Sequence, residues 1–300
     1  FIILFMDVSV IIVNYNTERL ILDCLDSLYE KTKGISFEVY VVDNASPIRP
    51  SLLSKDQRIT FLTSSENLGF GKANNLGSLH AHGKYLFFLN PDTLLINNAV
   101  KELFDFMERH PEVGICGSNL YKADRTPGHS YEMREPGILQ EIINSRSCTM
   151  TRFNEDFNNG TAPKEVSHVV GAALMIPKVL FNRIGGFDKD FFMYLEETFL
   201  CHQVKQLGYR IYNVPFSRII HLEGQSFTLR THFEDLLFNG RRTYYIKRFG
   251  KIYYHFSNIF YALNALANFA YLQLKGKKNE AQIWRYRLKK VGNPIKSSKK

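Results

Sequence analysis

The sequence lacks the features that mark several common classes of protein. Its 300 residues contain four cysteines, widely spaced and without a CxxC pair, which argues against a disulfide framework or a structural zinc site and favours a reducing compartment. The apolar run at residues 1–5 is far shorter than the ~20 residues that a membrane-spanning helix needs, and it has no basic flank or cleavage site. We interpret Met6 as a natural start and residues 1–5 as upstream read-through, and expect a cytoplasmic protein.

Acidic residues are almost absent from the last fifth of the chain. Residues 240–300 contain 15 Lys and Arg but one acid, a net charge of +14, whereas the other 239 residues carry −5. Such a basic segment predicts a polyanionic neighbour, either nucleic acid or an anionic membrane surface. The 45% apolar and 22% charged composition is otherwise ordinary for a folded protein and excludes a disordered, collagen-like or low-complexity chain.

Apolar, β-branched runs alternate with helical periodicities through the first half of the chain. This alternation indicates βαβ units and therefore an α/β fold with a mostly parallel sheet. A helix capped by Asn97 or Asn98 should run to about His110. The predicted strands cover residues 8–13, 37–42, 59–63 and 85–89.

The pattern changes after residue 117. Residues 118–165 are polar and irregular, and we expect long loops and short strands there. Residues 166–176 then predict a strand, residues 196–207 a helix stopped by Gly208, and residues 209–214 and 219–221 two further strands.

Residues 252–274 predict a long, mostly apolar helix flanked by basic clusters. Ser257, Asn264 and Asn268 fall on one side of its helical wheel. The length would permit a membrane span, but the polar residues favour a helix that lies in the membrane interface. The alternative is a pair of helices packed on the preceding domain, followed by a solvated basic end.

Polar clusters follow three predicted strands, at residues 14–16, 43–44 and 90–92. Ligands bind beyond the carboxyl ends of the strands in open parallel sheets. No GxGxxG motif follows the first strand, so the usual dinucleotide pyrophosphate site is not indicated. A carboxylate such as Asp92 can hold Mg²⁺ or Mn²⁺, which in turn binds a diphosphate; Asp92 and Asp43 could equally form turns.

Four further residues allow a chemical and a structural reading. Glu196 and Glu197 open a predicted helix, where acids complement the helix dipole, or one of them is a general base that takes a proton from an attacking hydroxyl. His221 ends a strand and is either structural or a ligand. Asn74 is either a surface residue of its helix or part of a site.

Eight segments in sequence resemble glycosyltransferase family 2, and within it the rhamnosyltransferase-like branch that builds bacterial cell-surface polysaccharide. They lie between residues 8 and 226 and include VSVIIVNYN (8–16), VVDNAS (41–46), ENLGFGKANNLG (66–77), FLNPDT (88–93), VGAAL (170–174) and IGGFD (184–188), followed by residues 191–200 and 214–226. The resemblance implies a GT-A fold. Residues 6–117 would form the Rossmann-like nucleotide-binding half, residues 118–230 the acceptor-binding and catalytic half, and residues 231–300 a helical basic extension.

The resemblance also implies a metal-dependent, inverting transfer of rhamnose or another hexose. The donor would be a dTDP- or UDP-sugar, and the acceptor a hydroxyl of a lipid-linked or polysaccharide molecule in cell-surface glycan synthesis. Asp92 and His221 would hold Mg²⁺ or Mn²⁺ on the donor diphosphate, and Glu197 would be the catalytic base, preceded by Glu196. The implied donor-binding residues are Asn14, Tyr15, Asp43, Asn67, Asn74 and Asn90.

The sequence departs from the family pattern at the implied catalytic base. Glu197 stands where relatives have Asp, and Phe199 replaces a second acid; the extra methylene moves the carboxylate by about an ångström, a scale to which reaction geometry is sensitive. A non-catalytic relative that binds sugar nucleotide, or an assembly subunit, is therefore an alternative. A nucleotidyltransferase would need a glycine-rich loop that residues 14–17 lack.

A nucleic-acid partner has no recognition motif in this sequence. We therefore expect the basic extension to meet the anionic inner face of a bacterial plasma membrane.

Overall fold

A computed structural model describes residues 6–141, 158, 160–222 and 230–292. The segment interpreted above as read-through, part of the polar region after residue 117 and the last eight residues lie outside this description. The chain divides into two compact units, residues 1–133 with 155–226, and residues 134–154 with 227–300. The boundary predicted at residue 117 falls inside a strand of the first unit.

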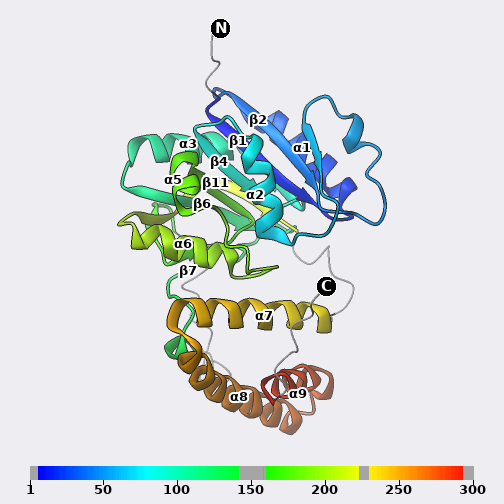
Figure 1. Cartoon of the computed structure of the whole chain (residues 1–300), viewed down its shortest axis with the longest axis vertical. Coiled ribbons are helices and arrows are strands. Elements are labelled where there is room, and N and C mark those ends of the chain that lie inside the picture. Colours follow the sequence, from blue (N-terminus) through cyan, green and yellow to red (C-terminus); the bar gives the residue numbers. More distant parts are fainter. Residues whose placement is uncertain (1–5, 142–157, 159, 223–229, 293–300) are drawn as a thin grey trace. The chain divides into compact units, whose positions relative to one another are not determined.

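The first unit is built on a large mixed sheet, with strand order β3-β2-β1-β4-β10-β6-β11-β5 and β8 paired to β11 (Figure 1). Strands β1 to β4, β6 and β11 run in one direction, which confirms the predicted mostly parallel sheet. The strands are β1 Val8–Asn14, β2 Phe37–Asp43, β3 Thr60–Thr63, β4 Tyr85–Leu89, β5 Thr93–Leu95, β6 Val113–Tyr121, β7 Tyr131–Glu132, β8 Lys164–Glu165, β9 His168–Val169, β10 Ala173–Pro177 and β11 Arg210–His221.

Helices cover both faces of this sheet. Helices α1 (Glu18–Lys31) and α3 (Ala99–Arg109) bury their apolar stripes against one face, where Val10, Ile12 and Phe87 point. Helices α2 (Phe70–His80), α5 (Lys178–Ile184) and α6 (Glu196–Gln206) pack on the other face. The predicted strands read as continuous apolar runs because both faces are covered in this way.

Two strand predictions need correction. Residues 166–176 form two strands, because the chain turns at residues 171–172; β9 pairs with β7, while β10 enters the main sheet antiparallel between β4 and β6. Residues 210–221, predicted as two strands, form the single strand β11 with a register shift between Val214 and Arg218. Pro215 lies in that shift, where a residue without an N–H does not break the ladder.

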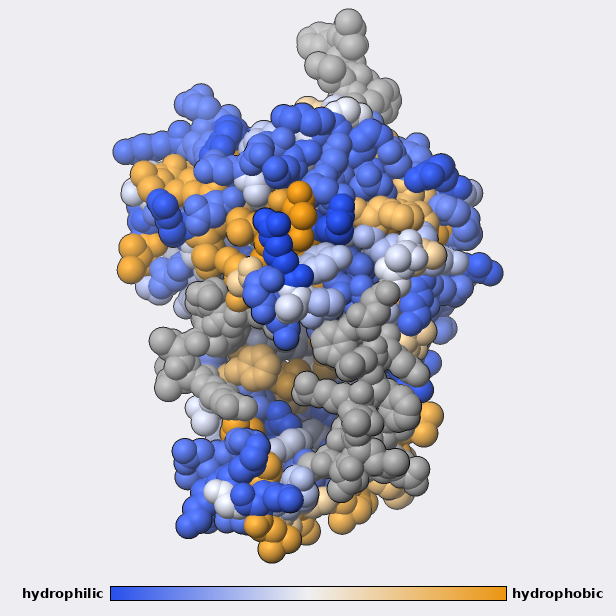
Figure 2. Space-filling view, turned by 180° about the vertical axis from the view of Figure 1, so that it is seen from behind, coloured by the Kyte–Doolittle hydropathy of each residue, from blue (hydrophilic) through white to orange (hydrophobic). Residues whose placement is uncertain are grey.

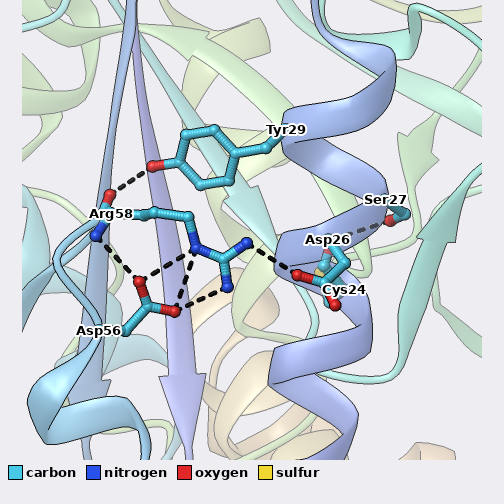
Figure 3. Close-up of polar contacts among 6 residues, drawn as sticks. All are labelled: Cys24, Asp26, Ser27, Tyr29, Asp56 and Arg58. Atoms are coloured by element: carbon cyan, nitrogen blue, oxygen red, sulfur yellow. Dashed lines mark hydrogen bonds and ion pairs between the residues drawn. The ribbon is translucent and has the colours of Figure 1, made fainter.

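Helix α1 is fastened to the β3 edge of the sheet by a surface cluster (Figure 3). Arg58 lies 2.7 Å from Asp26 of α1 and 2.7 Å from Asp56, and the Tyr29 hydroxyl donates to the Arg58 carbonyl. Exposed pairs of this kind add little to stability, about 0–1 kcal/mol each. These contacts link α1 to the β3 edge. On the inner side of α1, burial raises the pKa of the Cys24 thiol to about 12.

The second unit contains helices α7 (Arg230–Phe249), α8 (Lys251–Leu274) and α9 (Lys278–Gly292). Arg241 is buried at its centre and donates to Glu141 at 2.8 Å, to Asn258 at 2.8 Å and to Ser257 at 3.0 Å. The guanidinium also lies 4.6 Å from the ring centroid of Tyr245. Among the described residues, no helix is long and apolar enough to cross a membrane.

Candidate active site

Strands β1 and β2 bring two predicted donor-binding residues together at the carboxyl edge of the sheet. Their parallel register sets Asn14 opposite Asp43, and the Asn14 amide donates to Asp43 Oδ1 at 2.7 Å. The Ser46 hydroxyl donates to the same oxygen at 2.5 Å. The carboxylate is therefore held rigidly at the strand end, while the neighbouring Tyr15 ring is 44% exposed.

A second asparagine network shapes the loop that leads into α2. Asn44 donates to Asn67 Oδ1 at 2.9 Å and accepts from the Leu68 N–H at 2.8 Å. Asn67 Oδ1 also accepts from the Gly69 N–H at 3.0 Å. In this structure Asn67 therefore positions the loop beside Asp43, and Asn44, which we did not predict as a site residue, is its buried partner.

Helix α2 is tied to the segment that leads into α6. The Phe70 N–H donates to the Phe192 carbonyl at 2.8 Å, and Asn75 exchanges two hydrogen bonds with the backbone of Phe187, at 2.8 and 2.9 Å. Asn74 is buried and donates to the Phe70 carbonyl at 3.1 Å. The reading of Asn74 as a surface residue is therefore wrong.

The loop after β4 places Asn90 and Asp92 beside His221. The Asn90 N–H donates to the Ala172 carbonyl at 2.9 Å, and β5 pairs with the end of β11 so that Thr93 faces His221. His221 Nε2 then lies 3.4 Å from Asp92 Oδ1 and 3.4 Å from the Asn90 amide nitrogen. Two distant stretches of sequence thus meet as one polar cluster.

This cluster fits a hard divalent cation. Asp92 supplies a carboxylate, His221 an imidazole, and Asn90 a buried Oδ1 that has no hydrogen-bond partner in the part of the chain described here. Within the described ranges, no group of three or more His, Cys, Asp or Glu residues could hold a metal. Mg²⁺ is commonly held by one or two carboxylates together with substrate phosphates, so a small protein ligand set suits an ion shared with a diphosphate.

The two glutamates open α6 after a strained turn. Tyr194 and Leu195 have φ values of +71° and +68°, a left-handed conformation that costs a non-glycine residue about 1–3 kcal/mol and that gathers at functional sites. Glu196 is buried, and its Oε2 has no hydrogen-bond partner among the described residues. Glu197 is half-buried, at the end of the helix where backbone N–H groups have no partner within the helix.

Burial raises the pKa of both carboxyl groups, and the Glu197 charge raises the pKa of Glu196 further. The backbone N–H groups at the start of α6 and the nearby His129 act on the pKa of Glu197 in the opposite direction. Glu197 is consequently the carboxyl of the pair with more support for its ionised form. A carboxylate with a raised pKa is a stronger base than an exposed one.

Gly171 lies between Glu197 and the loop that carries Asn90 and Asp92. A Cβ added to Gly171 would lie 3.3 Å from Glu197 Cγ, and the next residue, Ala172, accepts the hydrogen bond from Asn90. The structure therefore gathers the predicted base and the predicted metal ligands at one edge of the sheet.

Phe199, which replaces the family's second acid, belongs to the core. It is buried, and its ring centroid lies 5.5 Å from that of Phe191. A carboxylate there would need a different environment.

Sequence reasoning missed Ser46, Asn44, Gly171 and His129. The first three lie inside segments that carry the family resemblance, which was the available signal. His129 lies in the irregular region, and its Nε2 is 3.0 Å from Glu132; no local pattern marks it.

A cavity of about 470 Å³ in the first unit contains none of the predicted site residues. It is lined by Asn97, Glu102, Asn119, Tyr121, Gly160, Thr161, Pro215, Phe216 and Arg218.

Comparison with known proteins places the chain in a family. The model of "Glycosyl transferase family 2" matches residues 9–185. The low-salt glycan biosynthesis hexosyltransferase Agl10 of Haloferax volcanii is 25% identical over 219 residues, covering 72% of this chain and 67% of that protein. The rhamnosyltransferase WbbL of Escherichia coli K12 is 25% identical over 230 residues, covering 71% and 83%. The dTDP-rhamnosyl transferase RfbF of Shigella flexneri is 23% identical over 225 residues, covering 73% and 70%.

A solved structure shares the fold. GalNAc-T7, crystallised with UDP, GalNAc and Mn²⁺, superposes with a TM-score of 0.55 at 15% identity. The match covers 81% of this chain but only 51% of GalNAc-T7. This likeness supports the GT-A fold expected from the sequence.

Proposed function

Because the chain belongs to glycosyl transferase family 2, we propose that this edge of the sheet transfers a sugar from a nucleotide-sugar to an acceptor hydroxyl in cell-surface glycan synthesis. The observation that carries the proposal is the meeting of Asp92 and His221, with Glu197 next to their loop through Gly171. Each part is placed by backbone pairing that links distant segments.

The donor in this proposal is dTDP-rhamnose or another nucleotide-hexose. Relatives are named rhamnosyl and hexosyl transferases. Asp43, held by Asn14 and Ser46, would accept a hydrogen bond from the nucleotide base of the donor. The exposed Tyr15 ring would lie against that nucleotide base. Asn67 and Asn74 would act mainly by shaping the walls of the donor site.

Asp92, His221 and the side-chain Oδ1 of Asn90 would hold Mg²⁺ or Mn²⁺ on the donor diphosphate. The ion supplies charge neutralisation for the leaving nucleoside diphosphate. The solved neighbour was crystallised with Mn²⁺, which agrees with this class of ion. Asp92 and His221 orient the diphosphate at the end of β4, so that the sugar is directed toward Glu197.

Glu197 is the proposed base. Its carboxylate takes the proton of the acceptor hydroxyl as that oxygen bonds to the anomeric carbon, and the bond from that carbon to the diphosphate oxygen breaks with its electron pair leaving on the diphosphate. Attack from the opposite face inverts the configuration. Glu196 is buried next to Glu197, and burial and the Glu197 charge raise the pKa of Glu196, so that Glu197 carries the charge of the pair.

The test is sugar transfer and donor hydrolysis by Glu197→Gln and Asp92→Asn. We expect Glu197→Gln to reduce turnover by about 10²–10⁴-fold, the range typical of general-base removal, and Asp92→Asn to remove the metal-dependent part of turnover. Glu30→Gln, at an exposed position of α1, is the matched control and should keep full activity. A panel of dTDP- and UDP-sugars, with and without Mg²⁺ or Mn²⁺, identifies the donor.

One result would favour the alternative of a non-catalytic binder. If nucleotide-sugars raise the melting temperature but neither transfer nor metal-dependent hydrolysis occurs in the unmodified protein, the chain binds donor without using it. If Glu197→Gln alone keeps full transfer activity, the base is a different residue.

The acceptor is proposed to be lipid-linked or a growing polysaccharide, met at the inner face of the plasma membrane. The basic second unit supports this location, since residues 230–292 contain 13 Lys and Arg against three acids.

A further inference from the structure

Helix α8 buries polar residues and exposes large apolar residues, which is the reverse of an ordinary amphipathic helix. Its polar residues Ser257, Asn264 and Asn268 are buried within the second unit. On the opposite side, large apolar residues that are more than half exposed recur every three or four positions from Ile252 to Leu266, and again at Leu274. These residues, called here the α8 apolar row, are Ile252, Phe256, Ile259, Leu263, Leu266 and Leu274.

Specific contacts fix this orientation. Ser257 and Asn258 accept hydrogen bonds from the buried Arg241, which is also paired with Glu141. Asn268 donates to Asn264 Oδ1 at 2.5 Å on the same face. Turning the helix over would leave the Arg241 guanidinium without these partners in the interior, at a large cost in free energy. The outward position of the apolar row is therefore built into the fold.

The row follows one side of α8. At 100° per residue its members fall within an arc of about 80°, and at 1.5 Å per residue they span about 33 Å. Single exposed apolar residues are ordinary, but a contiguous apolar strip marks an interaction surface. Figure 2 shows hydrophobic residues gathered along the outer edge of the α8 and α9 region, with hydrophilic residues beside them.

The charge around the row indicates what covers it. Residues 230–292 have a formal net charge of +10. Exposed lysines stand at both ends of α8, with Lys251 before it and Lys275, Lys277 and Lys278 after it. Their long side chains can reach phosphate groups while the apolar row enters the acyl region. Two copies of so basic a surface would repel each other, which disfavours a second copy as the occupant.

We infer that the α8 apolar row and its flanking lysines dock the chain on an anionic lipid leaflet, with α8 lying in the plane of the interface. This inference gives a surface to the membrane location proposed above and depends on no step of sugar transfer. No described helix could span the bilayer, so docking would be peripheral and sensitive to salt.

The experiment is cosedimentation of the full chain with vesicles of phosphatidylcholine containing phosphatidylglycerol, and with vesicles of phosphatidylcholine alone. The test variant is Ile259→Gln/Leu263→Gln/Leu266→Gln, in the middle of the row. We expect the unmodified protein to bind the anionic vesicles at low salt and the variant to lose about tenfold or more of that affinity, equivalent to about 1.4 kcal/mol. Lys275→Glu/Lys277→Glu/Lys278→Glu should lose binding and its salt dependence together.

The control replaces three apolar residues of the first unit that are more exposed than the three replaced in the row, Ile48→Gln/Leu79→Gln/Val179→Gln, and should bind as the unmodified protein does. Donor hydrolysis should be unchanged in all three variants, which separates this inference from the proposed reaction. If the row variant binds vesicles normally, the inference is wrong. If size-exclusion chromatography with light scattering shows that the row variant converts a dimer to a monomer without changing vesicle binding, the row instead covers a second copy.

Discussion

Asp43, Asp92 and Glu197 lie at the ends of secondary-structure elements, where a sequence pattern can identify them. Asp43 and Asp92 follow apolar strands, and Glu197 opens a helix. The roles of their partners could not be predicted in the same way. Asn14 binds Asp43 because β1 and β2 are in register, and His221 reaches Asp92 because β11 pairs with β5. These contacts depend on pairing across long stretches of chain, which local periodicity does not specify.

Glu196 provides a prediction at the residue scale. Its pKa is raised in the folded state by burial and by Glu197, so the unfolded chain releases this proton at lower pH than the folded chain. Stability should therefore fall as pH rises from about 4, the ordinary range of a glutamate pKa, toward the raised pKa. Glu196→Gln cannot ionise, so we expect it to be progressively more stable than the unmodified protein as pH increases.

Thermal unfolding measured across pH checks this expectation. Glu30→Gln, at an exposed position of α1, serves as the control and should follow the unmodified curve at every pH. A constant difference between Glu196→Gln and the unmodified protein from acidic to alkaline pH would contradict the raised pKa.

Among the helices and strands, those with a clear local sequence pattern could be predicted. The short strand β5 and the direction of strand β10 could not. Strands β1, β2 and β4 carry strong apolar patterns and lie where expected, and helix α6 begins at the expected residue, Glu196. Strand β10 was predicted without its direction, and its antiparallel place between β4 and β6 depends on the turn at Gly171. Strand β5 is three residues long, too short for a periodicity, and is formed only because β11 lies beside it.

The start of α2 provides a prediction at the element scale. Gly69 has φ +79°, and a Cβ there would lie 2.1 Å from the Phe192 carbonyl oxygen. Gly208 has a similar φ of +86° but open space around it. Both alanine variants carry the strain of a left-handed residue, so the difference between them isolates the clash with Phe192.

We expect Gly69→Ala to be less stable than Gly208→Ala by about 1–3 kcal/mol, a typical cost of forced backbone shifts. Urea unfolding measures the difference. Donor affinity should also fall in Gly69→Ala only, since this contact joins α2 to the segment before Glu196. Equal losses in the two variants would mean that α2 and residues 187–192 are not tightly coupled.

For the whole molecule, the two units use different means to hold their interiors together. The first unit has apolar clusters on both faces of a sheet. The second unit surrounds a buried arginine with glutamate, amide and hydroxyl partners and with tyrosine rings. The sequence correctly indicated a basic helical extension, but the wheel of residues 252–274 did not reveal that its polar side faces inward. Arg241, whose partners come from α8 and from Glu141, settles that orientation.

Arg241 therefore supplies the prediction for the whole molecule. Arg241→Met should destabilise the second unit by about 3–5 kcal/mol, because it leaves Glu141 buried without its counter-charge. Arg241→Met/Glu141→Gln should recover part of that loss. Calorimetry should show an earlier transition for the second unit, while nucleotide-sugar binding by the first unit persists; loss of donor binding in the single variant would show that the two units do not unfold separately.

The pairing of His221 with the loop after β4 has a consequence for how the protein is made. During synthesis the ribosome must release 131 further residues after Asn90 before its partner exists. Strands β1, β2 and β4 can pair early, since they are neighbours in the chain, whereas the ladder between β5 and β11 closes a very long loop and should form late. The strand ends that carry Asn14 and Asp43 would thus be in place well before His221 could reach Asp92. Under the proposed function, a chain without β11 would lack one of the groups that hold the donor diphosphate.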